Sequence, residues 1–119
     1  MLTIKANKLS KIQKDFNDLF PYLKLEFFQK IHSVYTGYPK QLRLKEDALL
    51  MPINNIHKNF CMNEYTTVRV LEQLFLEQFG ILAHVLRKSG NSWLETTKTE
   101  DWTLKRQNDE GKELSQFTH

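Results

Sequence analysis

The chain has 119 residues, of which 40% are apolar and 26% charged, a size and composition that fit one packed domain and exclude intrinsic disorder. No apolar stretch approaches the ~20 residues of a membrane span, and the first residues lack the apolar core of a secretory signal. The net charge of +3 is split mildly, with ten Lys/Arg against five Asp/Glu in residues 1 to 60 and seven against nine in 61 to 119, which is typical of a solvated surface.

The first predicted element is an amphipathic helix over residues 8 to 20. Its apolar side chains recur every three or four residues and so share one face: Leu9, Ile12, Phe16, Leu19 and Phe20. Pro21 ends this helix, because proline cannot continue the hydrogen-bond ladder. Next, Leu23, Leu25 and Phe27 alternate with charged residues, the pattern of a strand with one buried face.

The middle of the chain, residues 33 to 60, has the least regular pattern. We expect a short strand or a turn of helix in it, and another short strand near Asn59 to Asn63. A second amphipathic helix then starts at a capping threonine, Thr66 or Thr67, and ends at Gly80 in the left-handed cap position. The apolar face of this helix contains Val68, Leu71, Leu74, Phe75 and Phe79.

The next predicted unit is a β-hairpin. Its strands cover residues 81 to 87 and 93 to 97, and Gly90 forms the turn. The four residues from Thr97 to Glu100 match a capping box, which predicts a last helix over residues 100 to 109.

Together these elements predict an α+β fold over residues 1–119, a single domain built as a two-layer sandwich. The order is α-β-(β)-α-β-β-α, with helices on one face of a mixed or antiparallel sheet, and the leading specific arrangement is ferredoxin-like. At an offset of 59 residues Phe16 matches Phe75 and Phe20 matches Phe79, which indicates a weak internal repeat. We expect one core that contains Phe16, Phe20, Leu25, Leu71, Phe75, Phe79 and Val85.

Four segments of the second half form a recognisable set. They are Leu71 to Phe75 with Phe79-Gly80, Arg87 to Asn91, Trp93 to Thr97, and Asp101 to Leu104. In these segments the chain resembles a family of small bacterial proteins, of the Bacteroidetes type, that has no assigned function. The resemblance covers residues 66 to 111. It implies a stand-alone bacterial protein and brings no activity, cofactor or catalytic residue with it.

Cys61 is the one cysteine, so no internal disulfide can form, and we expect a cytoplasmic protein. Cys61 lies four residues after His57, but structural zinc needs four ligands, and His32 or His84 would have to come from elsewhere in the fold. The surroundings of Cys61 are typical of a core strand, so we expect a buried, unreactive thiol. The four glycines are too widely spaced for a phosphate-binding loop. We therefore expect no catalytic residue, no metal site and no cofactor.

Paired carboxylates occur at Asp15/Asp18, Glu46/Asp47, Glu100/Asp101 and Asp109/Glu110. Most have a structural explanation. Lys11 and Lys14 are helical i,i+4 partners of the first pair, the third pair would serve a helix N-terminus, and the last lies in a polar break. No pair indicates acid–base chemistry.

The hairpin contains the one cluster that suggests a binding site: Arg87, Lys88, Asn91 and Trp93. Cations beside an aromatic suit phosphate and base contacts, or an acidic protein patch. We expect the first three at an exposed tip, and Trp93 on a face with Glu95. The alternative is that Trp93 packs in the core together with Trp102, while the two cations only keep the tip soluble.

Three functions stay open on these observations. The leading one is a small, non-enzymatic interaction or adaptor module, a monomer rather than a homodimer, with an unknown protein partner and no membrane contact. The second is a nucleic-acid-binding protein that uses the basic N-terminal half and the hairpin at residues 87–93. The third is an enzyme whose site is assembled from dispersed residues.

Overall fold

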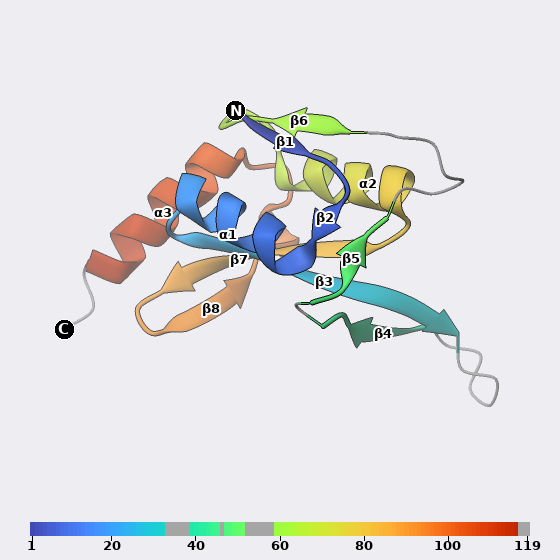
Figure 1. Ribbon diagram of the computed structural model, residues 1–119. Coiled ribbons are helices and arrows are strands. Elements are labelled where there is room, and N and C mark those ends of the chain that lie inside the picture. The colour runs from blue at the N-terminus through green and yellow to red at the C-terminus, as the bar shows by residue number, and fades with distance from the viewer. Residues whose placement is uncertain (33–38, 46, 52–58, 117–119) are drawn as a thin grey trace.

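The computed structural model describes residues 1–32, 39–45, 47–51 and 59–116, and for residues 30–32 and 39–41 the description covers the backbone alone. Its centre is a four-stranded antiparallel sheet in the order β4-β3-β7-β8 (Figure 1). The strands are β3 (Leu23–His32), β4 (Pro39–Arg43), β7 (Leu82–Ser89) and β8 (Ser92–Glu95). The two longest strands, β3 and β7, pair at the centre with Leu25 opposite Val85, so each hairpin has its shorter strand at an edge.

Three helices cover one face of this sheet (Figure 1). They are α1 (Leu9–Leu19), α2 (Val68–Phe79) and α3 (Leu104–Gln116). One side chain from each, Phe16, Phe75 and Leu104, joins the same buried cluster as Leu25 and Phe27 of β3. Within the described part of the chain, no helix combines the length and the apolar character that crossing a bilayer requires.

Two small ribbons complete the fold. β1 (Leu2–Ile4) pairs with β6 (Phe60–Met62), and β2 (Asn7–Lys8) pairs with β5 (Leu49–Leu50). The first ribbon lies over the helices, on the side away from the sheet, where the ring of Phe60 meets those of Phe75 and Phe79 (Figure 1). The strand predicted near residues 59 to 63 is thereby confirmed. β1 and β2 are too short to show an alternating pattern in the sequence.

Both predicted amphipathic helices are confirmed, with α1 and α2 within one or two residues of the expected bounds. At the start of α2 the Thr67 hydroxyl accepts a hydrogen bond from the Val70 amide at 3.2 Å, as an N-cap does. At its end Gly80 has a φ of 67°, the left-handed conformation that glycine adopts without strain.

The predicted core is also confirmed. All seven expected side chains are at most 5% exposed and belong to one cluster. Phe75 lies at its centre, with ring contacts to Phe27, Phe60 and Phe79 at centroid distances of 5.1, 5.1 and 6.3 Å. These edge-on and tilted contacts are the arrangements that aromatic pairs prefer.

The α+β class is confirmed, and the order of the elements explains the weak repeat. α1 precedes the hairpin β3–β4, and α2 precedes the hairpin β7–β8, so the chain contains two αββ units that meet where β3 pairs with β7. The strand order does not show the ferredoxin-like arrangement. In the described residues α1 and α2 each lead into a hairpin, rather than connecting two strands of the sheet.

The predicted last helix over residues 100 to 109 is wrong in both bounds. A 3-10 helix, η2 (Thr97–Thr99), occupies the expected capping box, and α3 starts only at Leu104. The Thr103 hydroxyl accepts from the Arg106 amide at 3.1 Å and so serves as its cap. α3 also continues through Gly111, a position where a Cβ atom would lie 3.0 Å from Cβ of Tyr22. Here glycine permits a close approach of helix and sheet instead of breaking the helix.

One edge of β3 is covered by α1 rather than by a strand. β4 pairs with β3 only from Phe28 onward. Before that point, the side-chain amide of Asn17 donates to the carbonyl oxygen of Leu23 at 2.8 Å, and that of Gln13 to Leu25 at 3.0 Å. Helix α1 therefore satisfies acceptors that a neighbouring strand would otherwise occupy.

Candidate functional site

The predicted hairpin is confirmed, with a turn at Gly90 where φ is 61°. The expectation that Arg87 lies at its exposed tip is wrong. Arg87 is half-buried, because strand alternation puts it on the helix side of the sheet with Val85. Its guanidinium donates to Oε1 of Gln107 at 2.8 Å and lies 5.5 Å from the ring centre of Trp102. Arg87 thus joins α3 to the sheet.

The other predicted site residues lie differently. Lys88 and Trp93 are opposite each other in the hairpin, on the side away from the helices, and Asn91 is exposed in the turn. Trp93 is half-buried, and Nζ of Lys24 lies 4.8 Å from its ring centre. Trp102 is also half-buried but lies at the α3 side, 3.7 Å from the guanidinium carbon of Arg106.

Trp93 belongs to a larger surface that we call the open face. It consists of the side chains that the sheet directs away from its helices: Lys24, Glu26 and Phe28 of β3, Arg43 of β4, Leu82, His84, Leu86 and Lys88 of β7, and Trp93 and Glu95 of β8. Among the described residues no helix covers it. The open face holds two aromatic positions, the ring pair Phe28–His84, with centroids 5.0 Å apart, and Trp93.

A groove of about 360 Å³ runs along the margin of the open face, between α1 and the sheet. Three cations, one carboxylate and one indole line it: Lys14, Lys24, Arg43, Glu26 and Trp93. The Glu26 side chain is only 16% exposed, accepts from Nη2 of Arg43 at 2.9 Å and lies 3.5 Å from Nζ of Lys24. Lys14, the third cation of the groove, pairs with Asp18 instead. The carboxylate of Glu26 is therefore shared by Lys24 and Arg43.

A second, smaller cavity of about 180 Å³ lies between α2, the end of β8 and the start of η2. Glu72, His84, Glu95 and two threonine side chains line it. Burial, together with the smaller effect of the nearby Glu100, raises the pKa of Glu72 to about 7. A carboxyl group that titrates near neutrality is suited to proton transfer.

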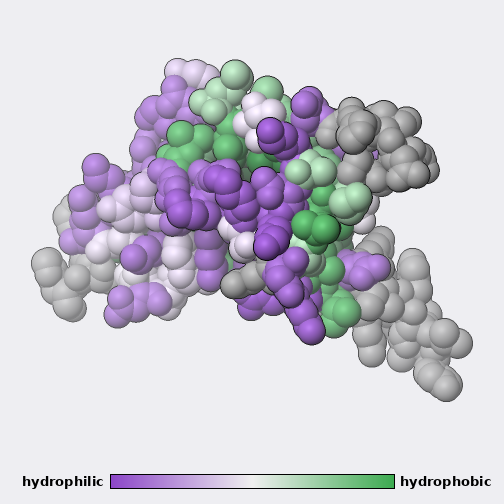
Figure 2. All heavy atoms as spheres, in the orientation of Figure 1, coloured by the Kyte–Doolittle hydropathy of each residue, from purple (hydrophilic) through white to green (hydrophobic). Residues whose placement is uncertain are grey.

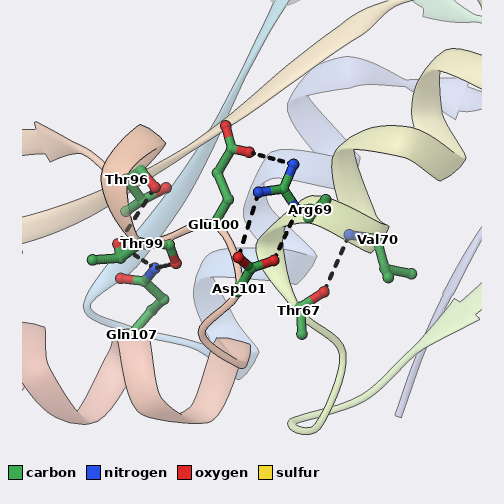
Figure 3. Close-up of polar contacts among 8 residues, drawn as sticks. All are labelled: Thr67, Arg69, Val70, Thr96, Thr99, Glu100, Asp101 and Gln107. Carbon is green, nitrogen blue, oxygen red and sulfur yellow. Dashed lines mark hydrogen bonds and ion pairs between the residues drawn. The ribbon is translucent and has the colours of Figure 1, made fainter.

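The raised pKa of Glu72 follows from how α2 meets the segment after β8. Figure 3 shows Arg69 of α2 between two carboxylates, 3.2 Å from Glu100 and 2.8 Å from Asp101. Arg69 holds the pKa of Asp101 below its usual range, chiefly through their hydrogen bond. Because Arg69 is committed to these two groups, it only partly offsets the burial of Glu72. Glu100 and Asp101 therefore join α2 to this segment, and the expectation that they serve a helix N-terminus is wrong.

Glu72→Gln is expected to stabilise the protein above neutral pH. In the folded state the Glu72 pKa is about 7, above the 4.5 of an unperturbed glutamate, so the unfolded chain loses this proton first. The wild type should therefore lose stability as the pH rises from about 5 to about 8, and the variant should lose less. Melting temperatures across this range, with the exposed Glu77→Gln as control, test this. If the melting temperatures of the wild type, Glu72→Gln and Glu77→Gln changed with pH in the same way, the prediction would be wrong.

The expected buried thiol is wrong. In β6 the side chains of Phe60 and Met62 face the core, so alternation exposes Cys61, whose Sγ lies 3.4 Å from Oγ1 of Thr3. His57 lies outside the described residues. Among those described, no three His, Cys, Asp or Glu side chains gather as metal ligands would.

Of the predicted carboxylate pairs, one has the expected structural role. Asp15 and Asp18 pair with Lys11 and Lys14 at 2.7 and 2.6 Å, as predicted. Asp109 pairs with Lys105 at 2.8 Å inside α3, so its expected place in a polar break is wrong. Glu46 of the remaining pair lies outside the described residues.

Apolar side chains also reach the surface away from the open face. Leu49 and Met51 are exposed at and just after β5, and Met1 and Tyr65 are exposed near the N-terminus. Figure 2 shows one hydrophobic area near the top of the view and another to the right of its centre, with hydrophilic surface between them. Such separate small patches are common on folded proteins. The open face is the stronger candidate, since it combines rings with three cations against two carboxylates.

The sequence interpretation missed Lys24, Phe28, Arg43 and His84 as site residues. Their alternation with buried residues was the available signal, because it directs all of them to one side of a sheet. The pattern did not show which strands are neighbours in the sheet.

Comparison with known proteins adds nothing to the geometry, since no family model, curated protein or solved structure matches the chain. The resemblance to small bacterial proteins stays a prediction.

Proposed function

We propose that the protein is a non-enzymatic binding module, a cytoplasmic monomer that holds an anionic partner on the open face. One observation carries the proposal. The fold brings Lys24 and Arg43 from the basic half of the chain onto the same face as Lys88 and Trp93 of the hairpin. Cations and aromatic side chains gathered on one uncovered face are typical of recognition surfaces.

The balance of charge on the open face supports an anionic partner. It holds Lys24, Arg43 and Lys88 against Glu26 and Glu95. Glu26 lies within 3.5 Å of two of these cations and offsets part of their charge, so the face keeps a small net positive charge. The groove beside the face adds Lys14, whose ammonium an anionic partner would share with Asp18.

Retention on immobilised heparin tests the proposal. The open-face variant carries Lys24→Gln, Arg43→Gln and Lys88→Gln, and the control carries Lys5→Gln, Lys98→Gln and Lys112→Gln. Both remove the same charge, and the control positions are exposed and lie elsewhere. We expect the open-face variant to elute at a clearly lower salt concentration than the control, because clustered cations dominate binding to a polyanion. Equal elution of two folded variants would contradict the proposal.

A further inference from the structure

We infer that the open face binds single-stranded nucleic acid, with bases stacked on its two aromatic positions and phosphates held by the cations between them. The inference rests on the proposed function and names its partner. Unpaired bases stack on aromatic side chains, and flat sheets that carry rings and cations suit them for this reason. Trp93 supplies one ring position, and the Phe28–His84 pair supplies the other.

The strand register separates the two ring positions by more than one base. Trp93 is opposite Lys88 on β7, and His84 lies four residues earlier on the same strand, a distance of about 13 Å along it. Lys24 is opposite Leu86, midway between them. Its ammonium lies 4.8 Å from the ring centre of Trp93, so a cation is available to the phosphate of a nucleotide whose base stacks there.

The rings distinguish nucleic acid from an acidic peptide. Cations are sufficient to bind a row of carboxylates. The open face also carries Phe28, which is only half-buried on the uncovered side of the sheet, where a side chain that faces solvent does not need to be aromatic. Leu86, between the two ring positions, is 8% exposed although it lies outside the main core cluster, so the face has an apolar floor. Bases need such a floor, and carboxylates do not.

The same geometry favours single strands over duplexes. A four-stranded sheet is too broad to enter a duplex groove, and its rings reach base faces only when the bases are unpaired. Glu26 makes the contact selective. Because its carboxylate engages both Lys24 and Arg43, phosphates must compete with it, and phosphate contacts alone are weakened.

Fluorescence anisotropy with labelled oligonucleotides of about ten nucleotides tests the inference, using single-stranded RNA and DNA and the matching duplexes. Trp93→Ala should weaken single-strand binding about tenfold or more, and Trp93→Phe should retain most of it, because a ring remains. The control is Leu94→Ala, an exposed neighbour on the opposite side of β8, which should bind as the wild type does. Glu26→Gln should tighten binding, since it releases two cations for phosphate.

Several outcomes would overturn the inference. They are duplexes that bind as tightly as single strands, an unchanged affinity of folded Trp93→Ala, weaker binding by Glu26→Gln, or equally strong competition by polyglutamate. If the heparin result still holds in any of these cases, the open face binds an anionic partner other than single-stranded nucleic acid, and only the inference fails. If the heparin variants also elute together, the proposed function fails with it.

Discussion

Replacing Phe75 with alanine is expected to lower the free energy of unfolding by about 3–5 kcal/mol. The side chain is fully buried and contacts rings from β3, from β6 and from its own helix. Its removal leaves a cavity in the middle of three packed layers, none of which can move in without losing its own contacts. A small domain has a total stability of about 5–15 kcal/mol, so this single change removes a large share.

Urea denaturation followed by circular dichroism measures the effect. The matched control is Leu76→Ala, the next residue on α2, which is 47% exposed and should cost far less. Equal midpoints for the two variants would show that Phe75 does not hold the layers together.

The second large effect is expected at Gly111. In the middle of a helix, replacing glycine with leucine normally stabilises by up to about 1 kcal/mol. Here the first side-chain atom would already lie 3.0 Å from Cβ of Tyr22 and 3.1 Å from both its carbonyl oxygen and Cγ of Arg87. A backbone oxygen cannot rotate away. Gly111→Leu should therefore push α3 from the sheet and destabilise the protein by about 1–3 kcal/mol or more.

The undocking of α3 has its own spectroscopic signature. Trp102 lies between Arg87 and Arg106, so its fluorescence should change in Gly111→Leu at low denaturant, before the main transition. Glu113→Leu, an exposed position on the same helix, is the control and should match the wild type. A more stable Gly111→Leu with an unchanged spectrum would mean that α3 does not need this close approach.

The parts of the fold that could be predicted well are those in which apolar residues recur at regular spacing within one element. α1, α2 and the hairpin β7–β8 each have a regular spacing of apolar residues and a nearby residue that ends or turns the chain. These residues are Pro21 after α1, Gly80 after α2 and Gly90 in the hairpin turn. The core residues could be predicted for the same reason, since they are the apolar members of these patterns.

The errors arose where a distant partner outweighs the local signal. Glu100 matches a capping box, yet its carboxylate pairs with Arg69 of α2, which lies far earlier in the chain. Gly111 resembles a helix break, yet the sheet requires glycine there. Gln107 is fully buried and joins Arg87 to the Thr99 carbonyl, a polar core contact that apolar patterns do not reveal.

The candidate site was only half predictable for a related reason. Trp93 and Lys88 were expected from the hairpin, but Lys24 and Arg43 join them only through the pairing of β3 with β7 and β4. Arg87 was expected beside Lys88 at the tip, and strand alternation instead directs these two neighbours to opposite sides.

The side-chain amides of α1 also affect how the protein behaves at high concentration. A bare strand edge presents acceptors that a strand from another molecule can use, which is a route to aggregation. β4 closes the edge of β3 from Phe28 onward, and Gln13 and Asn17 occupy the carbonyls of Leu25 and Leu23 before it. An incoming strand would have to displace both amides and lift the helix that bears them. A short β4 therefore does not leave β3 open to growth by strand addition.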